Sequence, residues 1–225
     1  ILGAMGVLAA YINRLKTGRG QRVDTSLFEA GIVHTYWQSA IAFATGIAPG
    51  PLGTAHPLNA PYQAFRTQDG WVTVGAANQA NWLRLTETLG APELAGDARF
   101  ADNASRMTHS EELEAALIPH FARRTTAEWL AALAAAGVPA GPVLDINQMH
   151  RDEQTLARAM VVDTDHPRAG TVKTLGLPVK FSETPGGVVR PAPTFGQHTR
   201  EVLAELGFSG AEIERLIEDG AVRAG

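Results

Sequence analysis

The stretch YQAFRTQDGWVTVGA, residues 62–76, holds two short runs of aromatic and β-branched residues on either side of Gln68, Asp69 and Gly70. An Asp-Gly pair between two such runs is a strong hairpin signal, because both residues tolerate the positive φ angles of a tight turn. We therefore expect an antiparallel hairpin with a positive-φ turn at Asp69-Gly70. This hairpin opens a small α+β domain that we predict over residues 56–175.

Helical signals follow the hairpin and fill the rest of the small domain. Thr108–Glu111 and Thr125–Glu128 have the spacing of a capping box, in which both side chains satisfy free backbone N–H groups at a helix start. Asp145 is expected to cap a further helix that runs toward Met160. A second hairpin is then expected to turn around residues 166–170.

Residues 1–46 predict a helix, a strand and a second helix. The first helix ends at Gly18, residues 21–27 alternate as in a strand, and an apolar, aromatic helix continues to Gly46. The GxG at residues 18–20 closes a helix, whereas a phosphate-binding glycine loop follows a strand and opens a helix. It therefore predicts a structural corner. The chain starts directly in the apolar helical pattern, which we interpret as a sign that further sequence precedes it.

Proline and glycine concentrate at residues 47–61 and 177–196, a composition typical of loops and linkers. We therefore predict a domain boundary in the first stretch and a return connection in the second, so that residues 1–55, of α/β character, and residues 176–225 flank the small domain. The chain is expected to finish in two short helices, the second of which is opened by a Ser209–Glu212 capping box.

Composition excludes several classes of function. The 225 residues carry a formal net charge of −4, which argues against a nucleic-acid partner. No run approaches the length of a membrane-spanning helix and there is no cysteine, so we expect a soluble, cytoplasmic protein without disulfides or membrane contact. The seven histidines lack any metal-ligand spacing. We expect neither a metal nor a tightly bound cofactor.

Few residues remain as candidates for chemistry. His56 lies in the Pro/Gly-rich loop and could face a site, whereas His34 and His120 lie in predicted helices and are expected to be structural. Asp24 is the most interesting carboxylate by position. Strand alternation puts it on the polar face, where we expect a solvated or ion-paired side chain.

Aromatic and basic residues around the first hairpin offer a binding hypothesis with a structural alternative. Four aromatic side chains could stack a ligand ring but are more typical of a core: Tyr62, Phe65, Trp71 and Trp82. Arg99 and Arg106 are expected to fasten the local loops with Asp97, Asp102 and Asn103.

Five stretches, in order, resemble one known family across essentially the whole chain. These stretches are LAAYINRLKTGRGQRVDTSLFEA, HPLNAPYQAFRTQDGWVTVGAANQANW, DARFADNASRMTHSEEL, EWLAALAAAGVPAGPV and PAPTFGQHTREVLAELGFS. The chain resembles the family III CoA-transferases, also called the CaiB/BaiF family. The resemblance implies a Rossmann-like large domain built from both ends of the chain, with the small α+β domain inserted. It also implies acyl-CoA and carboxylic acid substrates, with coenzyme A as a substrate rather than a bound cofactor.

The same resemblance implies where the functional residues lie. Family members carry further sequence ahead of this part, and the aspartate that forms their anhydride and thioester intermediates lies just upstream of the position matching Ile1. No residue of this chain is assigned that role. The loop over the reacting acyl group corresponds to Gly53, Thr54, Ala55 and His56, which we expect to bind substrate. Formyl-CoA transferases have a run of glycines here, and this chain has only Gly53, so a plain flexible linker remains an alternative.

Three functions remain open within the resemblance. The 2-methylacyl-CoA racemases of this fold carry a glutamate after the strand corresponding to residues 72–76, where this chain has Asn78 and Gln79. Amides cannot take up a proton as a carboxylate does, so a transferase is favoured over a racemase. A non-catalytic fragment or scaffold is the third possibility. Family members are interlocked dimers, and the extended residues 47–61 and 177–196 fit such connections, so we expect a homodimer.

Overall fold

The computed structural model describes residues 1–225 and divides into two compact units, Ile1–Gly141 and Pro142–Gly225. Each unit is described by itself. The domain boundaries expected after residues 55 and 175 remain predictions.

The first unit begins with three helices. Helix α1 (Leu2–Thr17) ends at Gly18, which takes the left-handed conformation (φ 72°), as predicted. The strand predicted over residues 21–27 is wrong, because residues 18–26 pair with no other strand. Ser26 instead caps the next helix by accepting a hydrogen bond from the Glu29 N–H. Leu27 therefore starts a helix rather than ending a strand.

The single helix predicted up to Gly46 is two helices, α2 (Leu27–His34) and α3 (Tyr36–Thr45). The break falls at Thr35, whose hydroxyl donates to the Ile32 carbonyl at 2.7 Å and so competes with the helical backbone. Gly46 ends α3 in the left-handed conformation, as expected. The apolar side chains of α1 to α3 are largely exposed in this chain.

The hairpin predicted at residues 62–76 is confirmed. Strand β1 (Tyr62–Arg66) pairs antiparallel with β2 (Trp71–Gly75), and the short β3 (Ala140–Pro142) lies on the other side of β2. The expected positive-φ turn is wrong, since neither Asp69 nor Gly70 has a positive φ. Asp69 is held instead by Thr126, whose backbone N–H donates to its carboxylate at 2.7 Å. A tertiary contact thus sets the shape of this turn.

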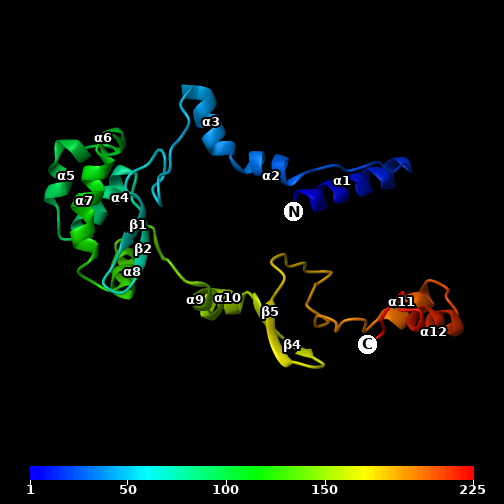
Figure 1. Ribbon diagram of the computed structural model, residues 1–225. Coiled ribbons are helices and arrows are strands. Elements are labelled where there is room, and N and C mark those ends of the chain that lie inside the picture. The colour runs from blue at the N-terminus through cyan, green and yellow to red at the C-terminus, as the bar shows by residue number, and fades with distance from the viewer. The chain divides into compact units, whose positions relative to one another are not determined.

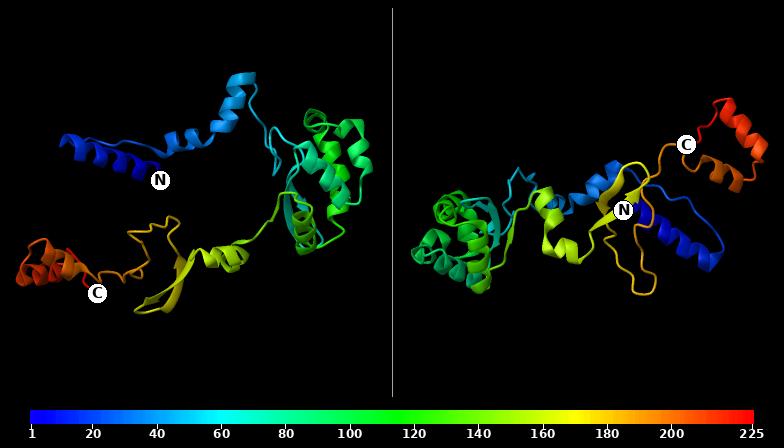
Figure 2. Two further views of the ribbon diagram at one scale, coloured as in Figure 1. Left: turned by 180° about the vertical axis from the view of Figure 1, so that it is seen from behind. Right: turned by 90° about the horizontal axis from the view of Figure 1, so that it is seen from below.

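Helices follow the hairpin and gather beside it in Figure 1 and in the two further views of Figure 2. Their bounds are α4 (Gln79–Thr88), α5 (Glu93–Gly96), a 3-10 turn (Ala98–Phe100), α6 (Asn103–Thr108), α7 (Ser110–Phe121) and α8 (Thr126–Ala135). Phe65 of β1 stacks on Phe121 with ring centres 4.5 Å apart, and Trp129 of α8 packs edge-on against Phe121. The hydrophobic core of the chain lies between this sheet and these helices.

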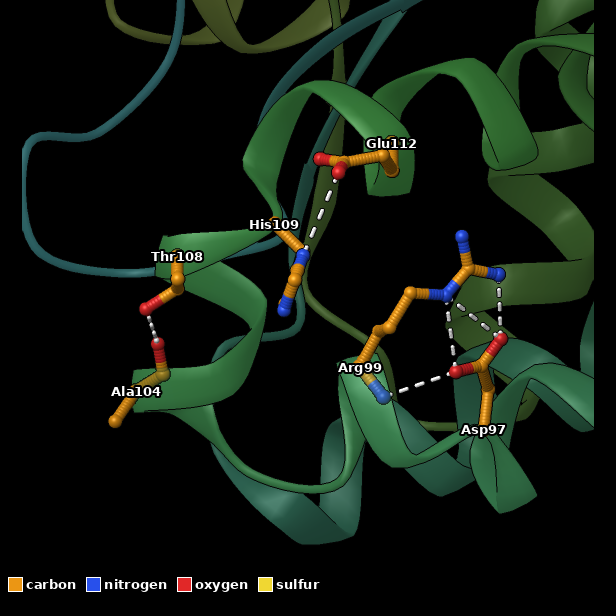
Figure 3. A network of polar contacts seen from close by, with 6 residues as sticks. All are labelled: Asp97, Arg99, Ala104, Thr108, His109 and Glu112. Atoms are coloured by element: carbon orange, nitrogen blue, oxygen red, sulfur yellow. Dashed lines mark hydrogen bonds and ion pairs between the residues drawn. The ribbon is translucent and has the colours of Figure 1, made fainter.

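One of the two capping boxes expected in this region forms. Thr125 and Glu128 make both reciprocal bonds at the start of α8, as predicted. The Thr108–Glu111 box is wrong, because Thr108 is the last residue of α6 and its hydroxyl donates to the Ala104 carbonyl at 3.0 Å. Figure 3 shows this bond, with His109 at the junction between α6 and α7.

The second unit carries α9 (Ile146–Arg151), α10 (Glu153–Ala157), β4 (Val161–His166), β5 (Gly170–Leu175), α11 (Thr199–Glu205) and α12 (Gly210–Glu218). Asp145 caps α9 and Ser209 caps α12 as predicted, and β4 and β5 form the expected hairpin. The helix expected to run toward Met160 is interrupted at Asp152, whose extended backbone (ψ 137°) lets its carboxylate cap α10. No helix of either unit has the length and apolarity that a membrane crossing requires.

Candidate functional site

A cavity of about 620 Å³ opens in the first unit where β2 leads into α4. It is lined by Asn59, Tyr62, Thr73, Val74, Gly75, Ala77, Asn78, Asn81, Pro139, Ala140 and Gly141. None of these side chains carries a charge at neutral pH, and three of them are asparagines that can donate and accept hydrogen bonds. A small polar or anionic molecule would meet no repelling carboxylate on this wall.

The loop of Gly53, Thr54, Ala55 and His56 lies against β1. The Ala64 N–H donates to the Thr54 hydroxyl at 3.0 Å, and the His56 N–H donates to the Tyr62 carbonyl at 2.9 Å. Gly53 has a positive φ (59°), and a side chain added there would meet open space. None of the four residues lines the cavity, but Asn59 and Tyr62, which contact His56, do.

The His56 ring is packed between two aromatic side chains. It stacks on Tyr62 with ring centres 5.1 Å apart and planes 4° from parallel, and it meets Trp37 of α3 edge-on, also at 5.1 Å. The ring is half-buried. Of the three histidines weighed from sequence, this is the one that contacts residues of the cavity wall, Asn59 and Tyr62. His34 and His120 lie within α2 and α7, as expected.

The two amide residues after β2 are tied into the fold by their side-chain oxygens. Asn78 caps α4 by accepting from the Asn81 N–H at 2.8 Å, and the Gln79 oxygen accepts from Arg106 at 3.2 Å. Neither amide can act as a base, so no proton-abstracting group stands at this end of β2. Asn78 and Asn81 both line the cavity and bring no charge to its wall.

Arg106 of α6 lies beside the site, and its long-range contacts are the ones that sequence reasoning missed. Its side chain is fully buried and donates to the carbonyls of Ala60, Phe100 and Ala77 at 2.7, 3.0 and 2.7 Å. The guanidinium also lies 5.2 Å from the Trp82 ring centre. Burial lowers the pKa of this group. It joins the segment before β1 to the segment after β2, the two segments beside the cavity.

No local pattern could have singled out Arg106, because its acceptors are 46, 29, 27 and 6 residues away. Its neighbour Asn103 behaves as expected and fastens the loop, accepting from the Ala60 N–H at 3.0 Å and donating to the Leu58 carbonyl at 2.9 Å. Asp102 caps α6.

Arg99, by contrast, makes the local contact that the sequence predicted. Figure 3 shows its guanidinium on the Asp97 carboxylate, at 2.6 Å from Nη2 to Oδ2. The hydrogen bonds from Arg99 lower the pKa of Asp97. Asp24 is likewise exposed and paired with Arg22, as expected.

The four aromatic candidates divide into two pairs. Phe65 and Trp82 are buried in the core, whereas Tyr62 and Trp71 are about half exposed. Tyr62 alone reaches the cavity.

A second, more apolar cavity of about 810 Å³ lies within the other unit, between α9, α10 and the β4–β5 hairpin. Its polar lining includes His150, Arg151 and Lys173. No group of side chains anywhere in the chain has the arrangement of a metal site.

Comparisons with known proteins agree on one family. Residues 1–199 match the family described as CoA-transferase family III. The chain is 38% identical over 218 residues to an acyl-CoA transferase of Fusarium pseudograminearum, covering 96% of this chain and 48% of that protein. It is 31% identical to the succinyl-CoA:glutarate CoA-transferase of Mus musculus, covering 96% and 50%.

Solved structures give the same result. A CaiB/BaiF family protein from Brucella suis is 32% identical, with a TM-score of 0.77, and the match covers 90% of this chain and 52% of that one. The chain thus spans about half the length of the curated relatives it matches.

Proposed function

Because the chain belongs to CoA-transferase family III, we propose that the whole protein transfers coenzyme A from an acyl-CoA thioester to a free carboxylic acid. The observation that carries this proposal is the family match over residues 1–199. The amides at Asn78 and Gln79 support a transferase over a racemase, because neither can accept a proton from the carbon next to a thioester.

The relatives suggest which acids to try. Curated relatives include a succinyl-CoA:glutarate CoA-transferase from mouse and, at 36% identity, an acetyl-CoA:oxalate CoA-transferase from Acetobacter aceti. We propose a dicarboxylic acid as the acceptor and a short acyl-CoA, such as succinyl-CoA, as the donor.

The chemistry we propose is covalent catalysis by an aspartate that relatives carry ahead of the part matching this chain. Its carboxylate attacks the thioester carbonyl, the CoA thiolate leaves, and an acyl anhydride forms. The thiolate then attacks the aspartyl carbonyl, which releases the donor acid and leaves an aspartyl-CoA thioester. The acceptor acid repeats the two steps in reverse and leaves as its CoA thioester. In this scheme residues 53–56 and the cavity contribute to binding the acids.

The test uses the whole protein with succinyl-CoA and a panel of acids, namely glutarate, oxalate and mesaconate. Mass spectrometry should detect a new acyl-CoA with the mass of the acceptor thioester. Deuterium uptake next to the thioester of 2-methylacyl-CoA in D₂O, without CoA transfer, would favour the racemase instead. The absence of both reactions, together with the absence of CoA binding by calorimetry, would favour a scaffold.

We also propose that the protein works as a homodimer. Large apolar side chains such as Met5, Leu8 and Phe28 are 60% or more exposed in α1 and α2, and such residues are usually covered in a functional assembly. Sedimentation equilibrium of the whole protein at micromolar concentration should give twice the monomer mass, and a stable monomer would contradict this proposal.

A further inference from the structure

The second cavity, of about 810 Å³, is built from one short stretch of the chain, residues 146–175. Helices α9 and α10 and the β4–β5 hairpin follow one another in this stretch, as Figure 1 shows. Small-molecule sites usually have volumes of about 300–1,000 Å³, so the cavity is large enough for a ligand.

Hydrogen bonds to the backbone join the parts of this cavity. At the end of α9 the Asp152 carboxylate caps α10, accepting from the N–H groups of Gln154 and Thr155 at 3.0 and 3.1 Å. The Met160 N–H donates to the Thr155 carbonyl at 3.0 Å, and the Gly176 N–H donates to the Met160 carbonyl, also at 3.0 Å. The helices and the two ends of the hairpin are thus connected before any ligand binds, which lowers the entropy lost on binding.

Most of the cavity wall is apolar. Its apolar side chains come from both helices and both strands of the hairpin, namely Ile146, Met149, Leu156, Val161 and Leu175. Ile146, Leu156 and Leu175 are each more than half exposed in the chain. Apolar side chains that are exposed together around a cavity favour an apolar ligand, since the ligand removes their surface from water.

The charged part of the wall is positive. Arg151 and Lys173 line the cavity and no acidic side chain does, although the chain has a net charge of −4. Lys173 is already paired with Asp163, at 2.9 Å from Nζ to Oδ1. None of the ion pairs of the chain includes Arg151. An anionic group placed beside the Arg151 guanidinium would therefore gain an attraction that no side chain of this protein supplies.

We propose that this cavity binds a small amphipathic carboxylate, with its unbranched apolar tail against the apolar wall and its carboxylate beside Arg151. A cation with the same tail would be repelled by Arg151 and Lys173. A short dicarboxylate such as glutarate would bring too little apolar surface to cover the wall. The inference does not rest on the transferase function, because residues 146–175 alone form the site.

Straight-chain carboxylates test the proposal on the whole protein, because tail length and head charge can be changed separately. NMR of the methionine methyl groups gives a local readout. Met149 lines the cavity, Met5 is exposed on α1, and Met107 packs against the core of the first unit. Octanoate should shift the Met149 signal in a saturable way, at concentrations that leave the signals of Met5 and Met107 unchanged.

The dissociation constant should follow both parts of the ligand. From hexanoate through octanoate to decanoate, Kd should fall about two- to fourfold for each added methylene, as the burial of a CH₂ group predicts. Octylammonium, which has the tail of octanoate and the opposite charge, should bind about tenfold more weakly.

Two pairs of variants assign the binding to named side chains. Arg151→Gln should weaken octanoate binding about three- to fivefold, the range for an exposed ion pair, whereas Arg158→Gln should leave Kd unchanged because Arg158, at the end of α10, does not line the cavity. Leu175→Ala should weaken decanoate binding about threefold or more, whereas Leu177→Ala, two positions further and outside the wall, should not.

Three results would each overturn the inference. The first is a Met149 signal that does not shift, or that shifts only at the concentrations that also move Met5, since the tails would then coat any exposed apolar surface. The second is an octylammonium affinity equal to that of octanoate. The third is an equal effect of Arg151→Gln and Arg158→Gln, because the cavity would then make no use of its unpaired cation.

Discussion

Replacing Arg106 with alanine should destabilise the first unit far more than an ordinary surface substitution. The change removes a fully buried guanidinium and leaves three backbone carbonyls, those of Ala60, Ala77 and Phe100, without their donor. Each buried acceptor left unpaired costs about 1–3 kcal/mol. The loss is partly offset, because a buried cation itself pays several kcal/mol of desolvation that the alanine avoids.

We therefore expect Arg106→Ala to lower the free energy of unfolding by about 3 kcal/mol, the lower end of the summed carbonyl penalties, because the avoided desolvation offsets the rest. Arg99→Ala is the matched control. Arg99 lies seven positions earlier in the same segment but is 52% exposed and pairs with one aspartate, so its loss should destabilise the chain far less than the loss of Arg106.

Urea unfolding of the chain, followed by tryptophan fluorescence, is a suitable assay because Trp82 lies under the Arg106 guanidinium and Trp129 lies in the same core. Circular dichroism should report the same midpoint if this part unfolds in one step. If Arg106→Ala and Arg99→Ala shift the midpoint equally, the hydrogen bonds of Arg106 contribute no more than a surface ion pair and the reasoning fails.

Two further predictions concern local structure. Thr125→Ala removes a side-chain cap and should cost about 1 kcal/mol in urea unfolding, whereas Thr108→Ala, which removes no cap, should cost less than half as much. Gly176→Ala should disrupt the β4–β5 hairpin, because the new methyl carbon would overlap the Ala159 carbonyl oxygen, whereas a methyl at Gly187 meets nothing within 4 Å. Hydrogen exchange across residues 161–175 should rise in the first variant and stay unchanged in the second.

Elements with local signals could be predicted from the sequence. The β1–β2 hairpin and the caps at Thr125, Asp145 and Ser209 all depend on residues within a few positions of each other. The predictions that were wrong are of two kinds. The helix breaks at Thr35 and Asp152 and the absent Thr108 box come from competing local hydrogen bonds, whereas two others depend on distant partners. The alternating residues 21–27 had no neighbouring strand to pair with, and the turn at Asp69 took its shape from Thr126, 57 positions away.

In the candidate site, too, some features could be predicted from the sequence and others could not. The sequence marked His56 as a loop residue that could face a site, but an irregular loop has no periodicity from which the placement of its ring could be predicted. That depends on Leu58, Asn59 and Tyr62 meeting the ring in three dimensions. The contacts of Arg106 could not be predicted from local sequence, because three of its four acceptors are 27 or more positions away.

The loop before β1 is better described as a positioned element than as a plain linker. Asn103 and Arg106, three residues apart on α6, bond the backbone of Leu58 and Ala60. Leu58 in turn donates to the ring of His56, so one face of α6 holds the loop that carries this ring. Because these bonds fix the loop, substitutions that loosen α6 should raise hydrogen exchange across residues 56–60, even though neither Asn103 nor Arg106 lines the cavity.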